Sequence, residues 1–197
     1  MEKFTIHTGT VALLERDNVD TDQIIPKQFL KRTERTGYGD CLFFDWRLDA
    51  EGRPRPEFPL NAPQYAGASI LVAGKNFGCG SSREHAVWAL RDYGFRCVIA
   101  PAFADIFANN CVKNGLLTVV LGPGALAQIK NRDAAGRFRL TVDLVRCEIS
   151  GTDGFKAHFD VDSFRRRCLL EGLDEIGMTL QHEGEIAGYE ARNLHRH

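Results

Sequence analysis

The chain has 197 residues, of which 44% are hydrophobic and 26% are charged, as in ordinary soluble globular proteins. Its 25 Lys and Arg residues balance its 26 Asp and Glu residues, and the net charge of −1 gives no reason to expect nucleic acid or an anionic membrane as a partner. No apolar run reaches the ~20 residues of a membrane helix, and the first residues lack the pattern of a secretory signal. We therefore expect a cytoplasmic protein with a single domain over residues 1–197.

The six cysteines are widely scattered, and no two of them form the close C-x-x-C pairs of zinc and iron–sulfur sites. They are also too sparse for a small secreted disulfide scaffold. We interpret most of them as free buried thiols and expect no metal site in this chain.

The first third of the chain predicts one strand and two long connections. Residues 9–14 (GTVALL) are typical of a strand, and an acidic turn follows up to Pro26. Residues 27–39 hold four basic side chains, a pattern that is usually a solvated helix face or loop. Residues 47–64 contain four prolines, which predict an extended surface connection.

The middle of the chain predicts alternating strands and helices. Strands are expected at residues 68–74, 96–103 and 116–122, and helices between them at residues 82–93 and 104–115, each ended by a glycine. This order implies parallel strands with right-handed crossover helices, which is an α/β fold.

The last third predicts antiparallel additions. Residues 138–149 and 155–161 are interpreted as an antiparallel pair joined by SGTDG. Residues 162–172 then predict a helix with Asp162 as its N-cap. The segment from residue 178 onward is predicted to be helical.

The stretch GCGSSREH (residues 78–85) supports a purely structural interpretation. Ser81 and Glu84 have the spacing of a capping box, in which the serine binds the N3 amide and the glutamate reaches back. Gly78 and Gly80 would then only form a tight turn between a strand and a helix.

The same stretch also supports a binding site. A helix N-terminus leaves amide donors free, and Arg83 has a planar fork that suits a carboxylate or phosphate. Ser81 and Ser82 would lie beside that bound carboxylate or phosphate. The same positive surroundings could stabilise the deprotonated form of a serine hydroxyl. The spacings of the phosphate-binding P-loop and of the G-x-S-x-G esterase turn are absent. The interpretation that remains is a site in which an arginine holds a carboxylate next to a serine that acts as a base.

Two segments together carry a family resemblance: NFGCGSSREHA (residues 76–86) and NVDTDQIIP (residues 18–26). The chain resembles the swivelling domain of the aconitase superfamily, and within it the bacterial small subunits of 3-isopropylmalate dehydratase. The resemblance extends over the whole chain, including GYGDCLFFDWR, FRRRCLLEGLDEIG and LQHEGEIAGYEA. It implies a three-layer β/β/α fold.

The resemblance implies a hydro-lyase that interconverts 2-isopropylmalate and 3-isopropylmalate through isopropylmaleate, in leucine biosynthesis. Such a chain would be active only with a large subunit, as a heterodimer or a higher assembly. The [4Fe-4S] cluster would belong to that large subunit, and this chain would bind no cofactor.

Matching the motifs residue by residue assigns the active-site roles. Ser81 falls on the catalytic base, and Asp22 on an active-site acidic position. Ser82 and Arg83 fall on positions that hold a substrate carboxylate, and Gly78 and Gly80 shape the same substrate site.

The basic stretch is the expected lid. Residues 27–39 could close over a dicarboxylate substrate, with Lys31 among its charges. Leu30 falls where isopropylmalate enzymes present an apolar side chain and homoaconitate enzymes present a basic one.

Two alternatives stay open. One is a related hydro-lyase that acts on citraconate or homoaconitate, and the residue at Leu30 would separate it from an isopropylmalate enzyme. The other is a non-catalytic module that binds a dicarboxylate and needs no iron–sulfur partner.

Overall fold

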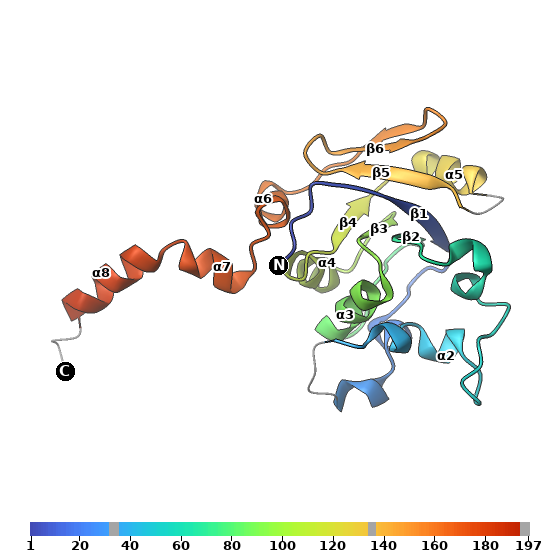
Figure 1. Cartoon of the computed structure of the whole chain (residues 1–197), viewed down its shortest axis with the longest axis horizontal. Helices are drawn as coiled ribbons and strands as arrows, with labels where there is room; N and C mark the ends of the chain where they lie inside the picture. The colour runs from blue at the N-terminus through green and yellow to red at the C-terminus, as the bar shows by residue number, and fades with distance from the viewer. Residues whose placement is uncertain (32–35, 134–136, 194–197) are drawn as a thin grey trace.

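Seven strands form one mixed sheet in a computed structural model, which describes residues 1–31, 36–133 and 137–193 (Figure 1). The strand order is β4-β3-β2-β1-β5-β6-β7. The strands are β1 Ile6–Leu14, β2 Ile70–Ala73, β3 Cys97–Ala100, β4 Leu117–Val120, β5 Arg139–Asp143, β6 Glu148–Gly151 and β7 Lys156–His158. The α-helices are α1 Thr21–Ile24, α2 Phe44–Arg47, α3 Glu84–Tyr93, α4 Asp105–Lys113, α5 Pro123–Arg132, α6 Ser163–Glu171, α7 Glu175–Leu180 and α8 Glu183–Asn193.

The sheet is parallel on one side of β1 and antiparallel on the other. β1, β2, β3 and β4 pair in parallel, and β1 pairs antiparallel with β5, which continues to β6 and β7. Successive side chains of β1 point to opposite faces, so Ala12 and Leu14 enter one hydrophobic cluster while Val11 enters the other.

Each hydrophobic cluster defines an interface between layers. The first joins the parallel strands to α3 and α4, with Ala86, Leu90 and Phe107 as members. The second joins them to the antiparallel strands, with Leu140 and Ile149 as members. Figure 1 shows β5 and β6 on one side of the parallel strands and α3 on the other. The expected three-layer β/β/α arrangement is confirmed.

The predicted strand–helix–strand–helix–strand order is also confirmed, as β2, α3, β3, α4 and β4. Both glycine stops have the backbone that a helix end requires, because φ is +117° at Gly94 and +71° at Gly115. Asp162 caps α6 as expected, since its Oδ1 accepts from the Arg165 N–H at 3.0 Å.

The antiparallel region differs from the prediction. Residues 138–149 were expected to be one strand, but they contain the whole of β5, a turn and the start of β6. Asp143 Oδ1 accepts from the Arg146 N–H at 2.9 Å, and Cys147 has a φ of +54°. An aspartate that bonds the backbone three residues on forms a turn, and the apolar Leu144 and Val145 obscured this turn in the sequence.

The helix α5 was not predicted. It begins with Pro123, and its buried residues are Leu126 and Ile129, so only one narrow stripe of it is apolar. Proline at the first position was the available signal, because its missing N–H needs no partner there.

The proline-rich loop is more compact than an extended connection. Pro59–Asn61 and Pro63–Tyr65 form two short 3₁₀ helices, and Phe58 and Leu60 are buried in the first hydrophobic cluster. The prolines start helical turns here instead of holding the chain extended, because two apolar side chains between them anchor the loop to the core.

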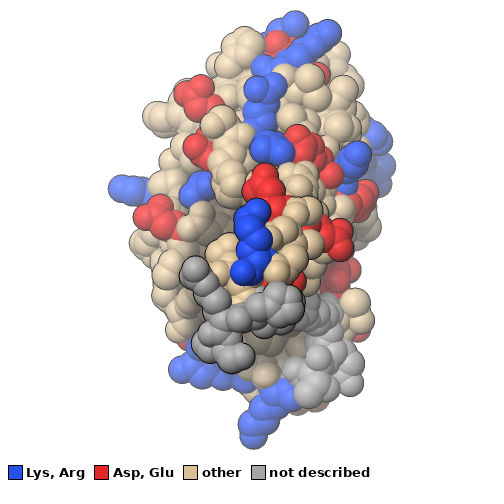
Figure 2. Space-filling model, turned by 90° about the vertical axis from the view of Figure 1, so that its left-hand side faces the viewer, with Lys and Arg blue, Asp and Glu red and all other residues tan. Residues whose placement is uncertain are grey.

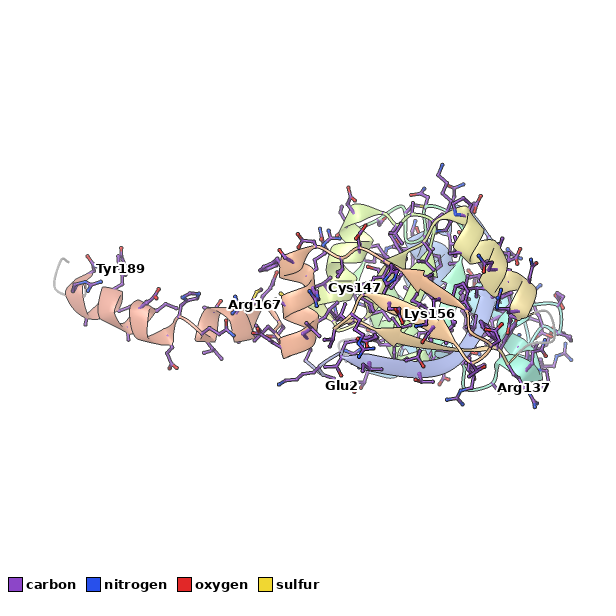
Figure 3. All side chains as sticks on the ribbon, turned by 90° about the horizontal axis from the view of Figure 1, so that it is seen from above. Glu2, Arg137, Cys147, Lys156, Arg167 and Tyr189 are labelled. Atoms are coloured by element: carbon purple, nitrogen blue, oxygen red, sulfur yellow. The ribbon has the colours of Figure 1, made fainter. Side chains whose placement is uncertain are left out.

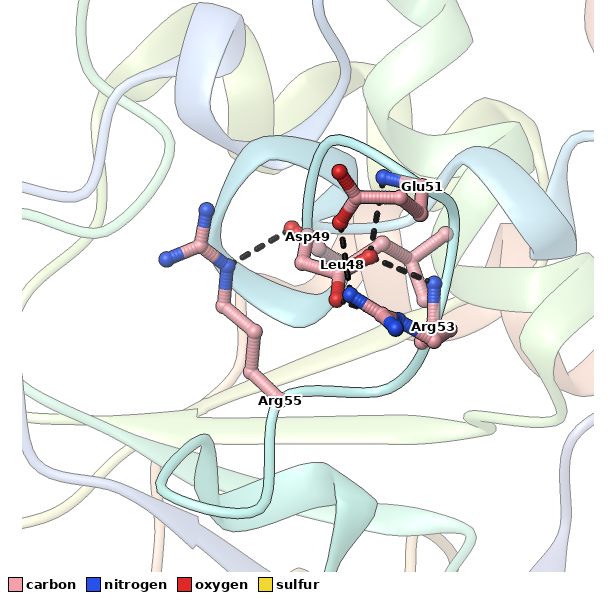
Figure 4. A network of polar contacts seen from close by, with 5 residues as sticks. All are labelled: Leu48, Asp49, Glu51, Arg53 and Arg55. Atoms are coloured by element: carbon pink, nitrogen blue, oxygen red, sulfur yellow. Dashed lines mark hydrogen bonds and ion pairs between the residues drawn. The ribbon is translucent and has the colours of Figure 1, made fainter.

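A polar network holds the tip of this loop (Figure 4). Arg53 Nε lies 2.8 Å from Asp49 Oδ2, and Arg53 Nη2 lies 2.7 Å from Glu51 Oε2. Arg55 Nε donates to the Leu48 carbonyl at 2.7 Å. These groups are mostly exposed, so we interpret the network as fixing the shape of the loop and not as a site.

The chain ends in an arm. Figure 1 and Figure 3 show α7 and α8 extending away from the sheet, with Tyr189 far from the rest of the molecule. No helix in the described residues is long and apolar enough to span a bilayer. Figure 2 shows positive and negative side chains interspersed on the face that the arm occupies.

Candidate active site

The two sequence motifs meet where β1 and β2 end. Because these strands pair in parallel, their carboxyl ends lie at the same edge of the sheet. The chain after β1 passes through residues 18–26, and the chain after β2 passes through residues 76–86. Ligands of α/β sheets commonly bind at this edge, beyond the carboxyl ends of the strands.

The first motif is held rigidly around α1. Asp20 is the N-cap of this short helix, and its Oδ1 accepts from the Gln23 N–H at 2.7 Å. The Gln23 side chain accepts in return from the Asp20 N–H at 2.9 Å, which completes a capping box. This box fixes the two residues between its ends, Thr21 and Asp22, against the second motif.

The second motif turns sharply at its two glycines. Gly78 has a φ of +77°, and a Cβ on it would lie 2.1 Å from the Phe107 ring. Gly80 has a φ of +88° and lies beside Asp20. Only glycine fits at position 78 without displacing the ring, so the turn depends on this residue for both conformation and space.

The predicted capping box at Ser81 and Glu84 is absent. The helix α3 begins at Glu84, two residues later than expected, with Arg83 as its N-cap in an extended conformation. The Glu84 carboxylate accepts from Asn114 Nδ2 at 2.8 Å instead of reaching back to the turn. This leaves the Ser81 hydroxyl without a hydrogen bond inside the described part of the chain.

Arg83 and Asp22 connect the two motifs through an ion pair. The Arg83 side chain is 13% exposed and the Asp22 side chain 40% exposed, so the pair lies partly out of water. Lys27 Nζ lies 4.0 Å from the other oxygen of Asp22. The result is a cluster of two cations and one carboxylate, next to Ser81 and Ser82, which are both exposed.

His85 belongs to the quoted motif but not to this cluster. Its ring lies 5.5 Å from that of Tyr38 and 4.7 Å from that of Trp88, measured between centroids. Burial lowers the pKa of His85, so the imidazole is neutral at neutral pH. We therefore assign His85 to packing.

The lid residues are only partly described. Lys27–Lys31 form a 3₁₀ helix, and residues 32–35 of the expected lid lie outside the described residues. Leu30 is partly buried against the first hydrophobic cluster, and Lys31 is exposed. The ion pair of Lys27 with Asp22 places the start of this helix at the site.

Two residues at the site, Thr21 and Phe107, were not predicted from the sequence, whereas Lys27 belongs to the expected lid. Thr21 lies inside a quoted motif, but no spacing rule distinguishes it from its neighbours. Phe107 lies 29 positions after Gly78 in the sequence, so only the folded chain brings them together.

This fold and the two joined motifs define an aconitase-type swivelling domain. Residues 1–124 match the family described as "Aconitase C-terminal domain". Residues 175–197 match the family that is described as the C-terminal domain of the small subunit of 3-isopropylmalate dehydratase. The chain belongs to the family of 3-isopropylmalate dehydratase small subunits.

Relatives of that name cover nearly the whole chain. The protein from Koribacter versatilis is 60% identical over 191 residues, which are 96% of this chain and 98% of the relative. The protein from Brevibacillus brevis is 56% identical over 193 residues, with 98% and 100% covered. The structure of 3-isopropylmalate dehydratase from Methanocaldococcus jannaschii superposes with a TM-score of 0.67 at 26% identity and covers 93% of this chain and 99% of that one.

Proposed function

We propose that this chain acts as the small subunit of 3-isopropylmalate dehydratase, in the interconversion of 2-isopropylmalate and 3-isopropylmalate through isopropylmaleate. The family membership supports this reaction. The observation that carries the site assignment is the exposed Ser81–Ser82 turn, which lies against the Arg83–Asp22 ion pair. The related activities on citraconate or homoaconitate have no observation in their favour here, and neither has a non-catalytic binding module.

Ser81 is the base in this proposal. In the dehydration, its oxygen takes the proton from the substrate carbon, the C–H electrons form the new double bond, and hydroxide leaves the neighbouring carbon. The start of α3 and the Arg83 guanidinium supply positive potential that stabilises a serine anion. Its free hydroxyl can face the substrate without breaking an existing contact.

Arg83 and Ser82 hold a substrate carboxylate. Asp22 orients the guanidinium through the ion pair, so the planar fork is preorganised before substrate arrives. Gly78 and Gly80 shape the turn so that the substrate can approach the backbone closely. The basic segment 27–39, with Lys31, acts as the lid of this single domain.

The cysteines of this chain do not fit an iron–sulfur cluster. Cys41, Cys97, Cys111 and Cys168 are buried, and no group of three or more metal-ligating side chains lies among the described residues. Burial raises the pKa of the Cys97 and Cys111 thiols, and a protonated thiol is a poor ligand. We therefore assign the [4Fe-4S] cluster to a large subunit, which would complete the site. When bound there, the cluster would act as a Lewis acid for the leaving hydroxyl. We expect this complex to be cytoplasmic.

The test is Ser81→Ala in the complex reconstituted with a large subunit under anaerobic conditions. A positioned base contributes roughly 10²–10⁴-fold, so turnover should fall by about that factor. The melting temperature should stay unchanged because the Ser81 hydroxyl has no partner in the described chain. Ser163→Ala is the matched control, an exposed serine at the start of α6. Near-normal turnover in Ser81→Ala would remove Ser81 as the base.

A further inference from the structure

Thr21 lies at the centre of the contacts between the two motifs. Its backbone N–H donates to the Cys79 carbonyl at 2.9 Å, and its hydroxyl donates to the Ser81 carbonyl at 3.0 Å. Two residues earlier in the first motif and one residue earlier in the second, the Gly78 N–H donates to the Val19 carbonyl at 2.7 Å. These three bonds fix the backbone of the turn from residue 78 to residue 81.

The Thr21 hydroxyl is buried, and it donates its hydrogen bond to this turn. The residue is only 1% exposed, and it is one of two buried polar residues in the described chain. A buried hydroxyl without a partner is costly, so it strongly favours the backbone position that keeps the Ser81 carbonyl within reach. The Arg83 N–H donates to the same carbonyl at 2.9 Å, which gives that oxygen two donors.

This carbonyl controls the direction of the groups that face the substrate. A trans peptide is planar, so the Ser81 carbonyl and the Ser82 N–H point in opposite directions. Since the carbonyl points at Thr21, the Ser82 N–H points away from it. Within the described residues the Ser82 N–H has no acceptor. The bonds that hold Ser81 in place also fix the direction of its Cα–Cβ bond, and thus where its hydroxyl can lie.

We propose that Thr21 is a positioning residue for proton abstraction, which acts by holding the Ser81–Ser82 peptide. The inference rests on the proposed role of Ser81 as the base. It assigns Thr21 no contact with the substrate. The hydroxyl makes the serine backbone rigid, so the base approaches the substrate carbon at one distance and angle.

The test compares Thr21→Val with Thr21→Ser in the assembled complex. Valine keeps the shape and loses the donor, whereas serine keeps the donor. A misplacement of 1 Å can slow a reaction about 10²-fold, so we expect turnover in Thr21→Val to fall by up to that factor and Thr21→Ser to restore most of it. Thr8→Val is the matched control, because its hydroxyl bonds Thr141 at 2.8 Å on the surface of β1 and β5.

A deuterium isotope effect separates positioning from a loss of stability. With substrate deuterated at the carbon that loses its proton, the effect on turnover should rise in Thr21→Val and return toward the wild-type value in Thr21→Ser. A loss of folded complex lowers the rate but leaves the isotope effect unchanged. If Thr21→Val does not assemble, Thr21→Cys replaces it, because it keeps a similar size with a weak donor.

The outcomes distinguish this inference from the proposed function. If Ser81→Ala is inactive and Thr21→Val has wild-type turnover and isotope effect, the positioning role is wrong and the base assignment stands. If Thr21→Val and Thr21→Ser lose activity equally with an unchanged isotope effect, Thr21 only stabilises the fold. If Ser81→Ala retains activity, both assignments fail.

Discussion

At the scale of single residues, we propose Leu30 as the side chain that selects the substrate. It is partly buried against the first hydrophobic cluster, at the end of the 3₁₀ helix whose first residue, Lys27, pairs with Asp22. An isopropyl group gains ~0.8 kcal/mol per buried CH₂ against such a surface. A carboxylate placed there would lose water and gain no partner, which costs more than the ~2–7 kcal/mol of burying an uncharged amide or hydroxyl without a hydrogen bond.

Leu30→Arg should therefore weaken the use of isopropylmalate and permit some turnover of a substrate with an extra carboxylate. The measurement is the ratio of kcat/KM for the two substrates in wild type and variant. Leu30→Met is the control, because it keeps an apolar surface of similar volume and should leave the ratio unchanged. An equal fall for both substrates would show that Leu30 only supports the loop.

At the scale of elements, the turn between β2 and α3 depends on its fit against α4. Phe107 of α4 lies directly under Gly78, and its ring also stacks edge-on with Phe77 at a centroid distance of 5.5 Å. This contact couples the position of the turn to a helix that supplies no proposed substrate contact.

Gly78→Ala should lower the free energy of unfolding by about 2–5 kcal/mol. A left-handed backbone costs an alanine about 1–2 kcal/mol, and the overlap with the Phe107 ring adds about 1–3 kcal/mol. Urea unfolding followed by fluorescence gives the difference.

The matched control is Gly67→Ala. Its φ is +72°, and a Cβ there meets nothing within 4 Å, so only the backbone cost remains. Equal destabilisation of the two variants would show that Phe107 moves aside freely.

At the scale of the whole molecule, the arm contributes little to the folded core. None of the described residues of α7 and α8 is buried, and Ile176, Leu180 and Tyr189 are 72%, 58% and 64% exposed. The root of the arm is tied down more firmly, since Met178 packs against the second cluster and the N-terminal amine lies 3.9 Å from Asp174.

Removal of residues 183–197 should change the free energy of unfolding by less than about 0.5 kcal/mol, as for surface changes in general. Removal of residues 174–197 should be clearly destabilising, because it removes Asp174 and also Met178, whose sulfur lies 3.7 Å from that of the buried Cys168. Thermal unfolding of the two truncated chains makes the comparison. A large loss of stability in the shorter deletion would mean that α8 packs on the body in solution.

The sequence by itself determined the parallel strands, the two crossover helices and their glycine stops. Each of these features depends on the local periodicity of hydrophobic residues or on the backbone preference of one residue. Both are properties of a short stretch of sequence. The motif residues Ser81, Ser82, Arg83 and Asp22 were also available from the sequence, through a family resemblance that the comparisons confirm. Their roles stay predictions.

Only the tertiary structure decided which of these residues touch. Ser81 and Glu84 have the spacing of a capping box, but the Glu84 carboxylate accepts a hydrogen bond from Asn114 instead. The neighbouring Arg83 forms its ion pair with Asp22. Thr21 lies 60 positions from Ser81, and their bond exists because β1 pairs with β2 in parallel and in one register. Pairing between distant strands depends on the burial of both sheet faces at once, a balance that no local stretch of sequence contains.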